Sequence, residues 1–260
     1  PRSSLRSVLL LDDYGHHSQK VAVCLGQIPG LKVHVLSNQR WVPVRFSRHV
    51  SSFQSYLASA SENEKLDAIV HAIKRTGSEV LVPVVEGVIQ FVQKHRTTFT
   101  PLIACAPCAS EEAMNLVTSK DTFCLYLEKN HFPLPATVYL NTAKPAAAEL
   151  DKLKFPILFK PVDSGGGIGI QSFADQKTFL AFLDVNPSKF RAIAQSHVAG
   201  YDVDCSVLCR DGNILANTIQ KSFLPRKNKY GRDEAIEFID HPNALEVVRK
   251  LMRALNWNGV

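Results

Sequence analysis

Apolar runs and amphipathic segments alternate through the first 110 residues of the chain. The apolar runs predict β-strands over residues 7–11, 31–37, 79–85 and 100–106. The amphipathic segments predict α-helices over residues 18–27, 64–77 and 87–95, the second of which ends at Gly77. Strands and helices that alternate at this spacing are typical of a parallel sheet with helices on both faces. The pattern therefore predicts a doubly wound α/β domain over residues 1–118.

The ends of the predicted strands carry the polar candidates of this first domain. Asp12 and Asp13 follow the first strand, and Pro83–Glu86 lie at the end of the third. Ligands of parallel sheets bind at the carboxyl ends of the strands, so these residues are candidates for a substrate pocket. They fit turn residues and helix caps as well, and both interpretations stay open. The turn after the first strand has no GxGxxG sequence, which argues against a dinucleotide site, and His16 and His17 are expected to be exposed loop residues.

The pattern changes after Ser110 and predicts a second domain that begins at residue 119. Two adjoining helices are expected between residues 110 and 132, with Ser119 as the cap of the second. Asp211 and Gly212 predict a tight hairpin between two strands. Further strands are predicted over residues 135–140, 155–162, 192–198, 201–207 and 214–223, and further helices over 145–154 and 243–255.

The stretch FKPVDSGGGIGIQSF, residues 159–173, places a lysine directly before a glycine-rich loop between two predicted strands. Glycines let backbone N–H groups converge on a phosphate, and Lys160 adds a compact positive charge. A P-loop and a protein kinase carry the lysine after the glycines, and a dinucleotide fingerprint needs a glycine where Ile170 stands. The alternative that remains is a glycine-rich hairpin that only turns the chain.

A lysine followed by a glycine-rich loop between two antiparallel strands resembles the ATP-grasp superfamily. Lys120 at a predicted helix start resembles the earlier lysine of that family. Gln195 stands where the family often has Glu, Val198 resembles the hinge residue that contacts adenine, and Asp202 falls seven residues after Gln195, in the ribose position. Read from the alternation alone, Asp202 lies on the polar face of a half-buried strand.

The resemblance implies the fold and the nucleotide site. It implies a Rossmann-like domain over residues 1–118, an ATP-grasp first subdomain over 119–198, and the start of a second subdomain over 199–260. In the basic loop after residue 223, Lys229 is the preferred partner of the terminal phosphate, and Lys221 on the preceding strand is the alternative. A basic loop that is only solvated stays open as well. The residues expected to bind ATP are Lys120, Lys160, Ser164, Gly165, Gly166, Gly167, Gly169, Gln195, Ser196, Val198, Asp202, Lys221 and Lys229.

The resemblance also implies a reaction. ATP phosphorylates a carboxylate, and an amine or thiol displaces the phosphate, so an amino acid or another small carboxylate is the expected substrate and an amine its partner. A relative of carbamoyl-phosphate synthase or biotin carboxylase is the alternative among enzymes, and a noncatalytic nucleotide-binding or regulatory module is the alternative from another class. The family often holds Mg²⁺ with a Glu-x-Asn sequence, and none follows Lys160. The fold is therefore expected to be incomplete at its C-terminus, with the metal ligands beyond residue 260, and catalytic residues are not assigned.

Composition narrows the partners and the compartment. The net charge of +6 is scattered without interleaved aromatic residues, which favours a small anionic ligand over nucleic acid. No apolar run reaches the length of a membrane span, so no membrane partner is expected and the predicted location is the cytoplasm. Cys105 and Cys108 form a lone CxxC pair, for which buried thiols are favoured over zinc or redox chemistry. A homodimer is left open.

Overall fold

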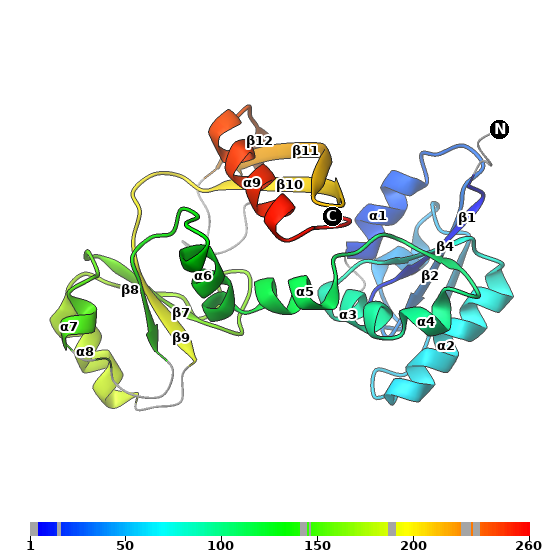
Figure 1. Cartoon of the computed structure of the whole chain (residues 1–260). Helices are drawn as coiled ribbons and strands as arrows, with labels where there is room; N and C mark the ends of the chain where they lie inside the picture. Colours follow the sequence, from blue (N-terminus) through cyan, green and yellow to red (C-terminus); the bar gives the residue numbers. More distant parts are fainter. Residues whose placement is uncertain are drawn as a thin grey trace. The chain divides into compact units, whose positions relative to one another are not determined.

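The computed structural model describes residues 5–14, 17–140, 145, 147–186, 191–224, 230 and 235–260 (Figure 1). The chain divides into two compact units. Unit 1 comprises residues 1–111 with Gly259, and unit 2 comprises residues 112–258 with Val260. The domain boundaries predicted at 118/119 and 198/199 stay predictions.

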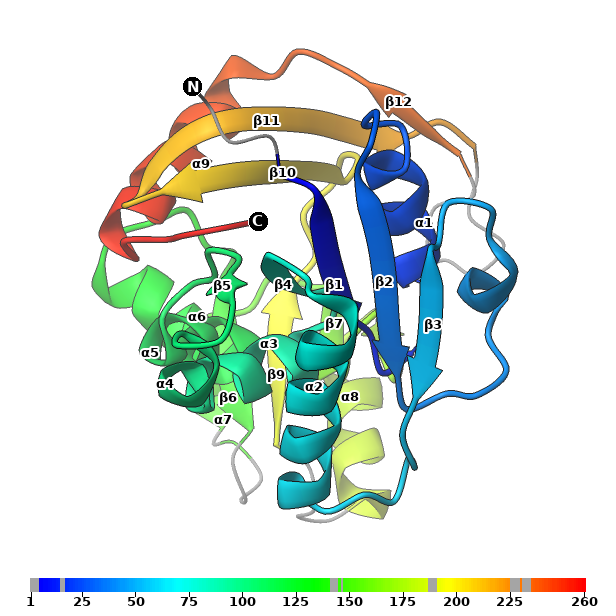
Figure 2. The same cartoon turned by 90° about the vertical axis from the view of Figure 1, so that its right-hand side faces the viewer.

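Unit 1 contains a parallel sheet, as the alternating pattern predicts. Among the described residues, five strands follow one another in the order β3-β2-β1-β4-β5, and every neighbouring pair is parallel. Figure 2 shows β1, β2 and β3 side by side. The strands are β1 (Ser7–Leu11), β2 (Lys32–Ser37), β3 (Ser52–Ser55), β4 (Val80–Pro83) and β5 (Ala104–Cys105).

Each face of this sheet packs against a different set of helices. On one face Leu9 and Leu11 belong to a buried cluster with α2 and α3, and on the other Val8 and Leu10 belong to a cluster with α1 and η1. Successive residues of a strand point to opposite faces, so one apolar run supplies both clusters. The helices of unit 1 are α1 (His17–Leu25), the 3₁₀ helix η1 (Pro43–Phe46), α2 (Glu62–Thr76), α3 (Glu86–Lys94) and α4 (Arg96–Phe99).

The predicted strand over residues 100–106 is wrong in its first half. Phe99 ends α4 in a fully buried position, and its carbonyl accepts hydrogen bonds from the N–H groups of Leu102 (2.8 Å) and Ile103 (3.0 Å). These bonds form a turn, and only Ala104 and Cys105 pair with β4. The pattern also missed β3, because SFQS has no apolar run to mark it.

The first sheet of unit 2 carries the glycine-rich loop. Among the described residues it is antiparallel, with the strand order β6-β9-β7-β8, and the loop joins β7 to β8 as predicted. Phe159 and Phe179 are buried in the cluster beneath this sheet. Its elements are β6 (Thr137–Leu140), α7 (Ala147–Leu150), β7 (Ile157–Pro161), β8 (Gln171–Phe173), α8 (Gln176–Val185) and β9 (Ala192–Ser196).

One predicted helix of unit 2 and one predicted helix cap need correction. The helix expected over residues 145–154 is reduced to α7, because a turn after Leu150 brings Leu153 back into the same buried cluster. The two helices expected between residues 110 and 132 are α5 (Glu111–Thr118) and α6 (Lys120–Lys129). Ser119 stands at the N-cap position of α6 but its side chain caps no backbone N–H, because the hydroxyl donates to Asp121 Oδ1 at 2.6 Å.

A second sheet of unit 2 contains β10 (Val203–Arg210), β11 (Asn213–Ser222) and β12 (Ile236–Phe238) in that order, with α9 (Pro242–Ala254) packed against β10 and β11. The predicted hairpin is confirmed, since Asp211 (φ 48°) and Gly212 (φ 72°) both adopt left-handed conformations between β10 and β11. Such a pair of positive φ angles is what a two-residue hairpin turn requires.

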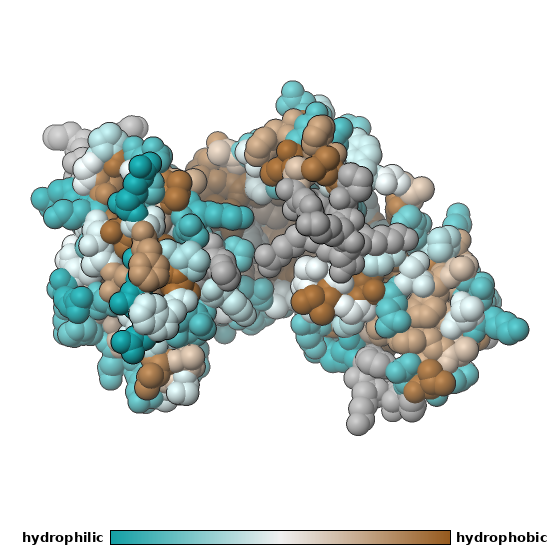
Figure 3. Space-filling view, turned by 180° about the vertical axis from the view of Figure 1, so that it is seen from behind, coloured by the Kyte–Doolittle hydropathy of each residue, from teal (hydrophilic) through white to brown (hydrophobic). Residues whose placement is uncertain are grey.

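The surface shows no simple division into apolar and polar sides. On the face in Figure 3, apolar residues form groups separated by hydrophilic residues. None of the helices that the structure describes combines the length and the apolar character needed to cross a membrane.

Candidate functional site

A row of polar side chains crosses the first sheet of unit 2 on the face opposite to Phe159. Lys160 on β7 donates from Nζ to Gln195 Oε1 at 2.7 Å, and Gln195 on β9 donates from Nε2 to Thr137 Oγ1 on β6 at 3.0 Å. The strand register puts Leu158 opposite Gln195 and Lys160 opposite Ile193, so all these side chains share one face. The same alternation that buries Phe159 therefore directs Lys160 to the other face.

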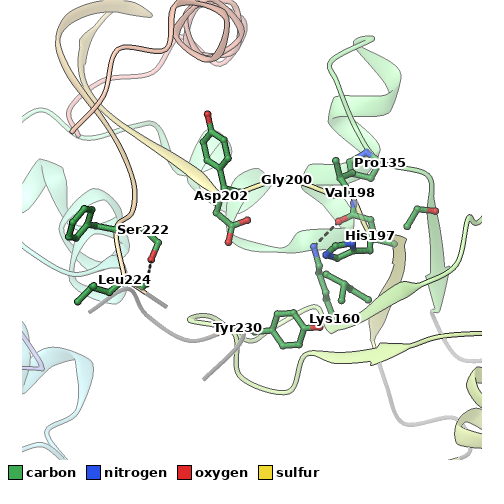
Figure 4. A pocket seen from close by; sticks show the side chains of 15 residues that line it. Pro135, Lys160, His197, Val198, Gly200, Asp202, Ser222, Leu224 and Tyr230 are labelled. Carbon is green, nitrogen blue, oxygen red and sulfur yellow. Dashed lines mark hydrogen bonds between the residues drawn. The ribbon is translucent and has the colours of Figure 1, made fainter. Parts of the chain in front are cut away.

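This row lies in an open pocket of about 920 Å³ within unit 2. Lys160, Asp202 and Tyr230 project toward the same space (Figure 4). Five of the residues predicted to bind ATP line the pocket, namely Lys160, Gln195, Ser196, Val198 and Asp202. The pocket therefore brings together residues from β7, from β9 and from the segment that follows β9.

The charge on Lys160 is poorly compensated. Burial lowers the pKa of Lys160, and the nearby charge of Lys120 lowers it further, while Cys124 and Asp202 act in the opposite direction. Its hydrogen-bond partner Gln195 is neutral, and none of the described carboxylates forms an ion pair with it. An anion that binds beside a half-buried ammonium without a paired carboxylate stabilises the charged form of that ammonium.

Lys120 lies at the start of α6 and holds the chain that enters the glycine-rich loop. Its ammonium donates to Val162 O at 3.2 Å and to Ser164 O. Burial lowers the pKa of Lys120, whereas Asp163 and Cys124 oppose this shift. Lys120 is not part of the pocket lining, but its charge acts on Lys160, so the two cations belong to one electrostatic environment.

An ion pair fixes the helix that carries Lys120. Arg191 Nη2 lies 2.8 Å from Asp121 Oδ2, which ties the first turn of α6 to the residue before β9. Burial alone would raise the pKa of Asp121, but hydrogen bonds from Ser119, Arg191 and the N–H of Thr122 hold it below its usual range. The sequence analysis missed this pair, because its members lie 70 residues apart and no local pattern joins them.

The glycine-rich loop folds back on itself in turns. Gly166, Gly167 and Gly169 have φ angles of 61°, 79° and 76°, which only glycine adopts at little cost. A Cβ on Gly167 would lie 1.6 Å from the carbonyl oxygen of Tyr230, so this position also requires the absence of a side chain. Gly165 has open space where its Cβ would be, and the Ser164 hydroxyl donates to Pro161 O at 3.2 Å.

The segment after β9 offers a backbone donor to the pocket. The N–H groups of Ser196 and His197 donate to Ala136 O (2.9 Å) and Pro156 O (3.0 Å). In the described part of the chain, the N–H of Val198 makes no hydrogen bond, and its side chain is exposed. The N–H of Val198 is therefore a candidate donor to a ligand in the pocket.

The remaining predicted residues lie in different surroundings. Lys221 forms an ion pair with Glu237 at 3.1 Å and lies over the ring of Tyr201, outside the pocket lining. Lys229 lies outside the described residues. The sequence analysis missed Tyr230 and His197, which line the pocket. Tyr230 could have been identified as a candidate ligand contact, because it is an aromatic residue within the basic loop.

Asp12 and Asp13, two of the polar candidates of unit 1, are held by contacts within that unit. Asp12 is buried and accepts from the N–H groups of Tyr14 (2.8 Å) and Ser18 (2.7 Å), which caps the start of α1. Asp13 pairs with Lys65 at 2.8 Å and accepts a hydrogen bond from the Tyr56 hydroxyl. Burial raises the pKa of both Cys105 and Cys108, and these thiols are not oxidised to a disulfide.

The part of the chain that the structure describes contains no group of three or more His, Cys, Asp or Glu side chains placed to hold a metal ion.

Solved structures with the same arrangement of elements are numerous, although no protein-family model and no curated protein sequence matches the chain. An L-amino acid ligase from Bacillus licheniformis matches 96% of this chain and 59% of its own with a TM-score of 0.66 at 16% identity. N5-carboxyaminoimidazole synthetase from Staphylococcus aureus, complexed with ADP, matches 98% and 64% with a TM-score of 0.69 at 15% identity. These proteins have ATP-grasp folds. The chain has an ATP-grasp fold.

A third relative shares this ATP-grasp fold. It is the biotin carboxylase domain of a 2-oxoglutarate carboxylase from Hydrogenobacter thermophilus, complexed with MgADP, ADP and bicarbonate, and it matches 98% of this chain and 59% of its own with a TM-score of 0.67 at 14% identity. The present chain thus spans about three fifths of the length of these three solved structures. The predicted fold class is confirmed, while the roles of the individual site residues stay predictions.

Proposed function

We propose that the chain binds ATP in the pocket of unit 2 and that the protein is an ATP-dependent ligase that joins a carboxylate to an amine or a thiol. The observation that carries the proposal is Lys160, a half-buried ammonium whose pKa is lowered by burial and whose hydrogen-bond partner is the neutral Gln195. The likeness to three ligase and carboxylase folds supports the same conclusion.

We expect the nucleotide to lie in the pocket in the following orientation. Adenine would accept a hydrogen bond from the free N–H of Val198, and the ribose hydroxyls would donate to the Asp202 carboxylate. The phosphates would then lie against Lys160 and Lys120, beneath the loop that contains Gly165, where converging backbone N–H groups bind anions well.

The proposed reaction has two steps. A carboxylate oxygen attacks the γ-phosphorus of ATP, the bond to the β,γ-bridging oxygen breaks, and ADP leaves with that electron pair. The amine or thiol then attacks the carbonyl carbon of the acyl phosphate, phosphate leaves, and the nucleophile loses one proton. Lys160 and Lys120 would offset the negative charge that gathers on the phosphate oxygens, and the loop would exclude water from the acyl phosphate.

Magnesium is implied by the fold, and bound to ATP it would neutralise phosphate charge. The described residues hold no group of three or more His, Cys, Asp or Glu side chains that could bind this ion.

The test of the ligase is release of ADP and phosphate. Purified protein is incubated with ATP, MgCl₂ and pools of amino acids, with bicarbonate and with simple carboxylates in separate reactions. We expect phosphate release that depends on both a carboxylate and an amine or thiol. ATP binding without release in any pool would instead support the second candidate, a nucleotide-binding regulatory module.

Adenine nucleotides should stabilise the protein more than guanine nucleotides. At a hundred times its dissociation constant, ATP should add about 2.7 kcal/mol to the free energy of unfolding. GTP at the same concentration should add less, because the guanine edge presents a donor where adenine presents an acceptor to the Val198 N–H. Thermal unfolding with ATP, ADP and GTP measures the difference, and equal shifts for ATP and GTP would contradict the assignment of Val198.

The protein should take up protons when ATP binds, at pH values between the pKa of Lys160 in the free protein and its pKa in the complex. Burial lowers the pKa of Lys160 in the free protein, and phosphate oxygens beside it would raise the pKa in the complex. Between the two pKa values the free lysine is neutral and the bound lysine is charged, so uptake begins as pH rises through the lower value, and affinity falls there. Below both pKa values the lysine is charged in the free protein and in the complex, and uptake from Lys160 vanishes. Calorimetric titrations in buffers of different ionisation enthalpy measure the uptake.

Gln195→Glu is the control for this assignment. A carboxylate 2.7 Å from the ammonium favours the charged form, so it should raise the pKa of free Lys160 and move the onset of uptake to higher pH. If proton uptake began at the same pH in Gln195→Glu as in the unaltered protein, the proton would bind to a group other than Lys160.

A further inference from the structure

Unit 1 contains a pocket of its own, separate from the residues proposed to bind ATP. It has a volume of about 490 Å³, within the range of small-molecule sites. It opens where β2 and β3 end, the edge at which ligands of parallel sheets bind. The lining residues are Asn38, Arg40, Arg45, Phe53, Ser55, Tyr56, Leu57 and Ala58.

Two arginines give this pocket a positive charge that the described residues do not neutralise. Neither Arg40 nor Arg45 forms an ion pair with a described carboxylate, and the hydrogen bond of the Arg45 guanidinium goes to the backbone oxygen of Arg40 at 3.0 Å. Asp13, which accepts a hydrogen bond from the pocket residue Tyr56, forms its ion pair with Lys65. Most N–H donors of the two guanidinium groups are therefore available to a ligand.

Aromatic rings hold Arg45 in place. Its guanidinium carbon lies 4.8 Å from the centre of the Trp41 ring and 5.6 Å from that of Phe53. Trp41 is itself stacked on Phe46, with 6.4 Å between ring centres, and both rings are more than 70% exposed. A guanidinium on an aromatic face keeps its edge free, and that edge is the part that binds an oxyanion with two hydrogen bonds.

Asn38 supplies the third feature. Its Oδ1 atom is buried and has no hydrogen-bond partner among the described residues. A buried acceptor without a donor costs free energy that a ligand with an N–H or O–H group would recover.

We propose that this pocket binds a small molecule that carries an oxyanion, either a carboxylate or a phosphate, and a planar or apolar body. Arg40 and Arg45 bind the oxyanion, the ring of Phe53 and the side chain of Leu57 contact the body, and Asn38 accepts from a donor on the ligand. Every group involved belongs to unit 1, so the proposal does not depend on the nucleotide site.

The test uses the fluorescence of Trp41, which lies under Arg45, in a Trp257→Phe background that removes the other tryptophan of the chain. Phenyl phosphate and benzoate are titrated as the phosphate and carboxylate probes, L-phenylalanine as a carboxylate with an N–H donor, and benzamide as the neutral counterpart of benzoate. Potassium chloride keeps the ionic strength constant, because screening alone weakens exposed charges.

We expect saturable binding of at least one anionic probe with a dissociation constant below about 1 mM, and none of benzamide. Arg40→Gln and Arg45→Gln should each weaken binding about tenfold or more, and Asn38→Asp should weaken it through repulsion. Arg48→Gln is the matched control, since Arg48 lies in the same segment and outside the pocket lining. A stronger response to phenyl phosphate or to benzoate identifies which oxyanion the site prefers.

Three results would overturn the proposal. They are the absence of saturable binding by every anionic probe, equal binding of benzamide and benzoate, and an equal loss in Arg48→Gln. Arg40→Gln keeps the test decisive if Arg45→Gln fails to fold, because Arg40 is exposed and its guanidinium lies 5.8 Å from the centre of the exposed Trp41 ring. ATP affinity is measured in every variant and should not change, so a failure here is distinguishable from a failure of the proposed nucleotide site.

Discussion

Lys160→Ala is expected to weaken ATP binding by roughly ten- to a hundredfold and to leave the stability of the fold nearly unchanged. A charge-assisted hydrogen bond to phosphate contributes on the order of 1.5 to 3 kcal/mol. Removal of the ammonium also relieves the cost of burying it in the free protein, which is why stability should not fall. Calorimetric titration measures the affinity, and chemical denaturation without ligand measures the stability.

Two controls sharpen this expectation. Lys160→Arg should also bind ATP less well, because the planar guanidinium does not replace a compact ammonium beside Gln195. AMP should lose less affinity than ATP on Lys160→Ala if the lysine contacts phosphates beyond the first. Unchanged ATP affinity in Lys160→Ala would remove the basis of the proposed nucleotide site.

Phe159→Ala is expected to destabilise unit 2 by about 3 to 5 kcal/mol, the usual cost of deleting a buried aromatic side chain. Phe159 is 1% exposed, and its ring centre lies 5.2 Å from that of Phe182 in an edge contact. The deletion leaves a cavity that the sheet and α8 cannot close without losing other contacts. The midpoint of urea unfolding, compared at equal slope, measures the change.

Phe238→Ala provides the matched control, since Phe238 lies on a strand of the same unit and is 66% exposed. Its loss should change the free energy of unfolding by much less than 1 kcal/mol. An equally small effect of Phe159→Ala would mean that the cluster beneath β7 does not support the fold. Phe159 and Lys160 are neighbours on one strand, so the pair also tests whether the two faces of β7 have separate roles.

Much of the fold could be predicted from local pattern. The alternation of Val8, Leu9 and Leu10 inside one apolar run was enough to predict a strand buried on both faces, because neighbouring side chains of a strand must point opposite ways. Asp211 and Gly212 predicted their hairpin for an equally local reason, the ease with which they adopt positive φ. The pattern failed where a long-range contact overrode it, as where the turn after buried Phe99 interrupts the expected strand.

The features of the candidate site also fall into those that local sequence predicts and those that depend on long-range contacts. The sequence by itself determined that Lys160 precedes a loop of glycines between two strands and that it points away from Phe159, since composition and the two-residue period of a strand depend only on neighbours in the chain. Only the tertiary structure decided that Gln195 meets Lys160, that Lys120 holds Ser164, and that Arg191 anchors α6 through Asp121. Each of these contacts joins residues 35 to 70 positions apart. No local propensity specifies such a contact. Each contact depends on which strands pair in the folded sheet and on which charged groups that pairing buries.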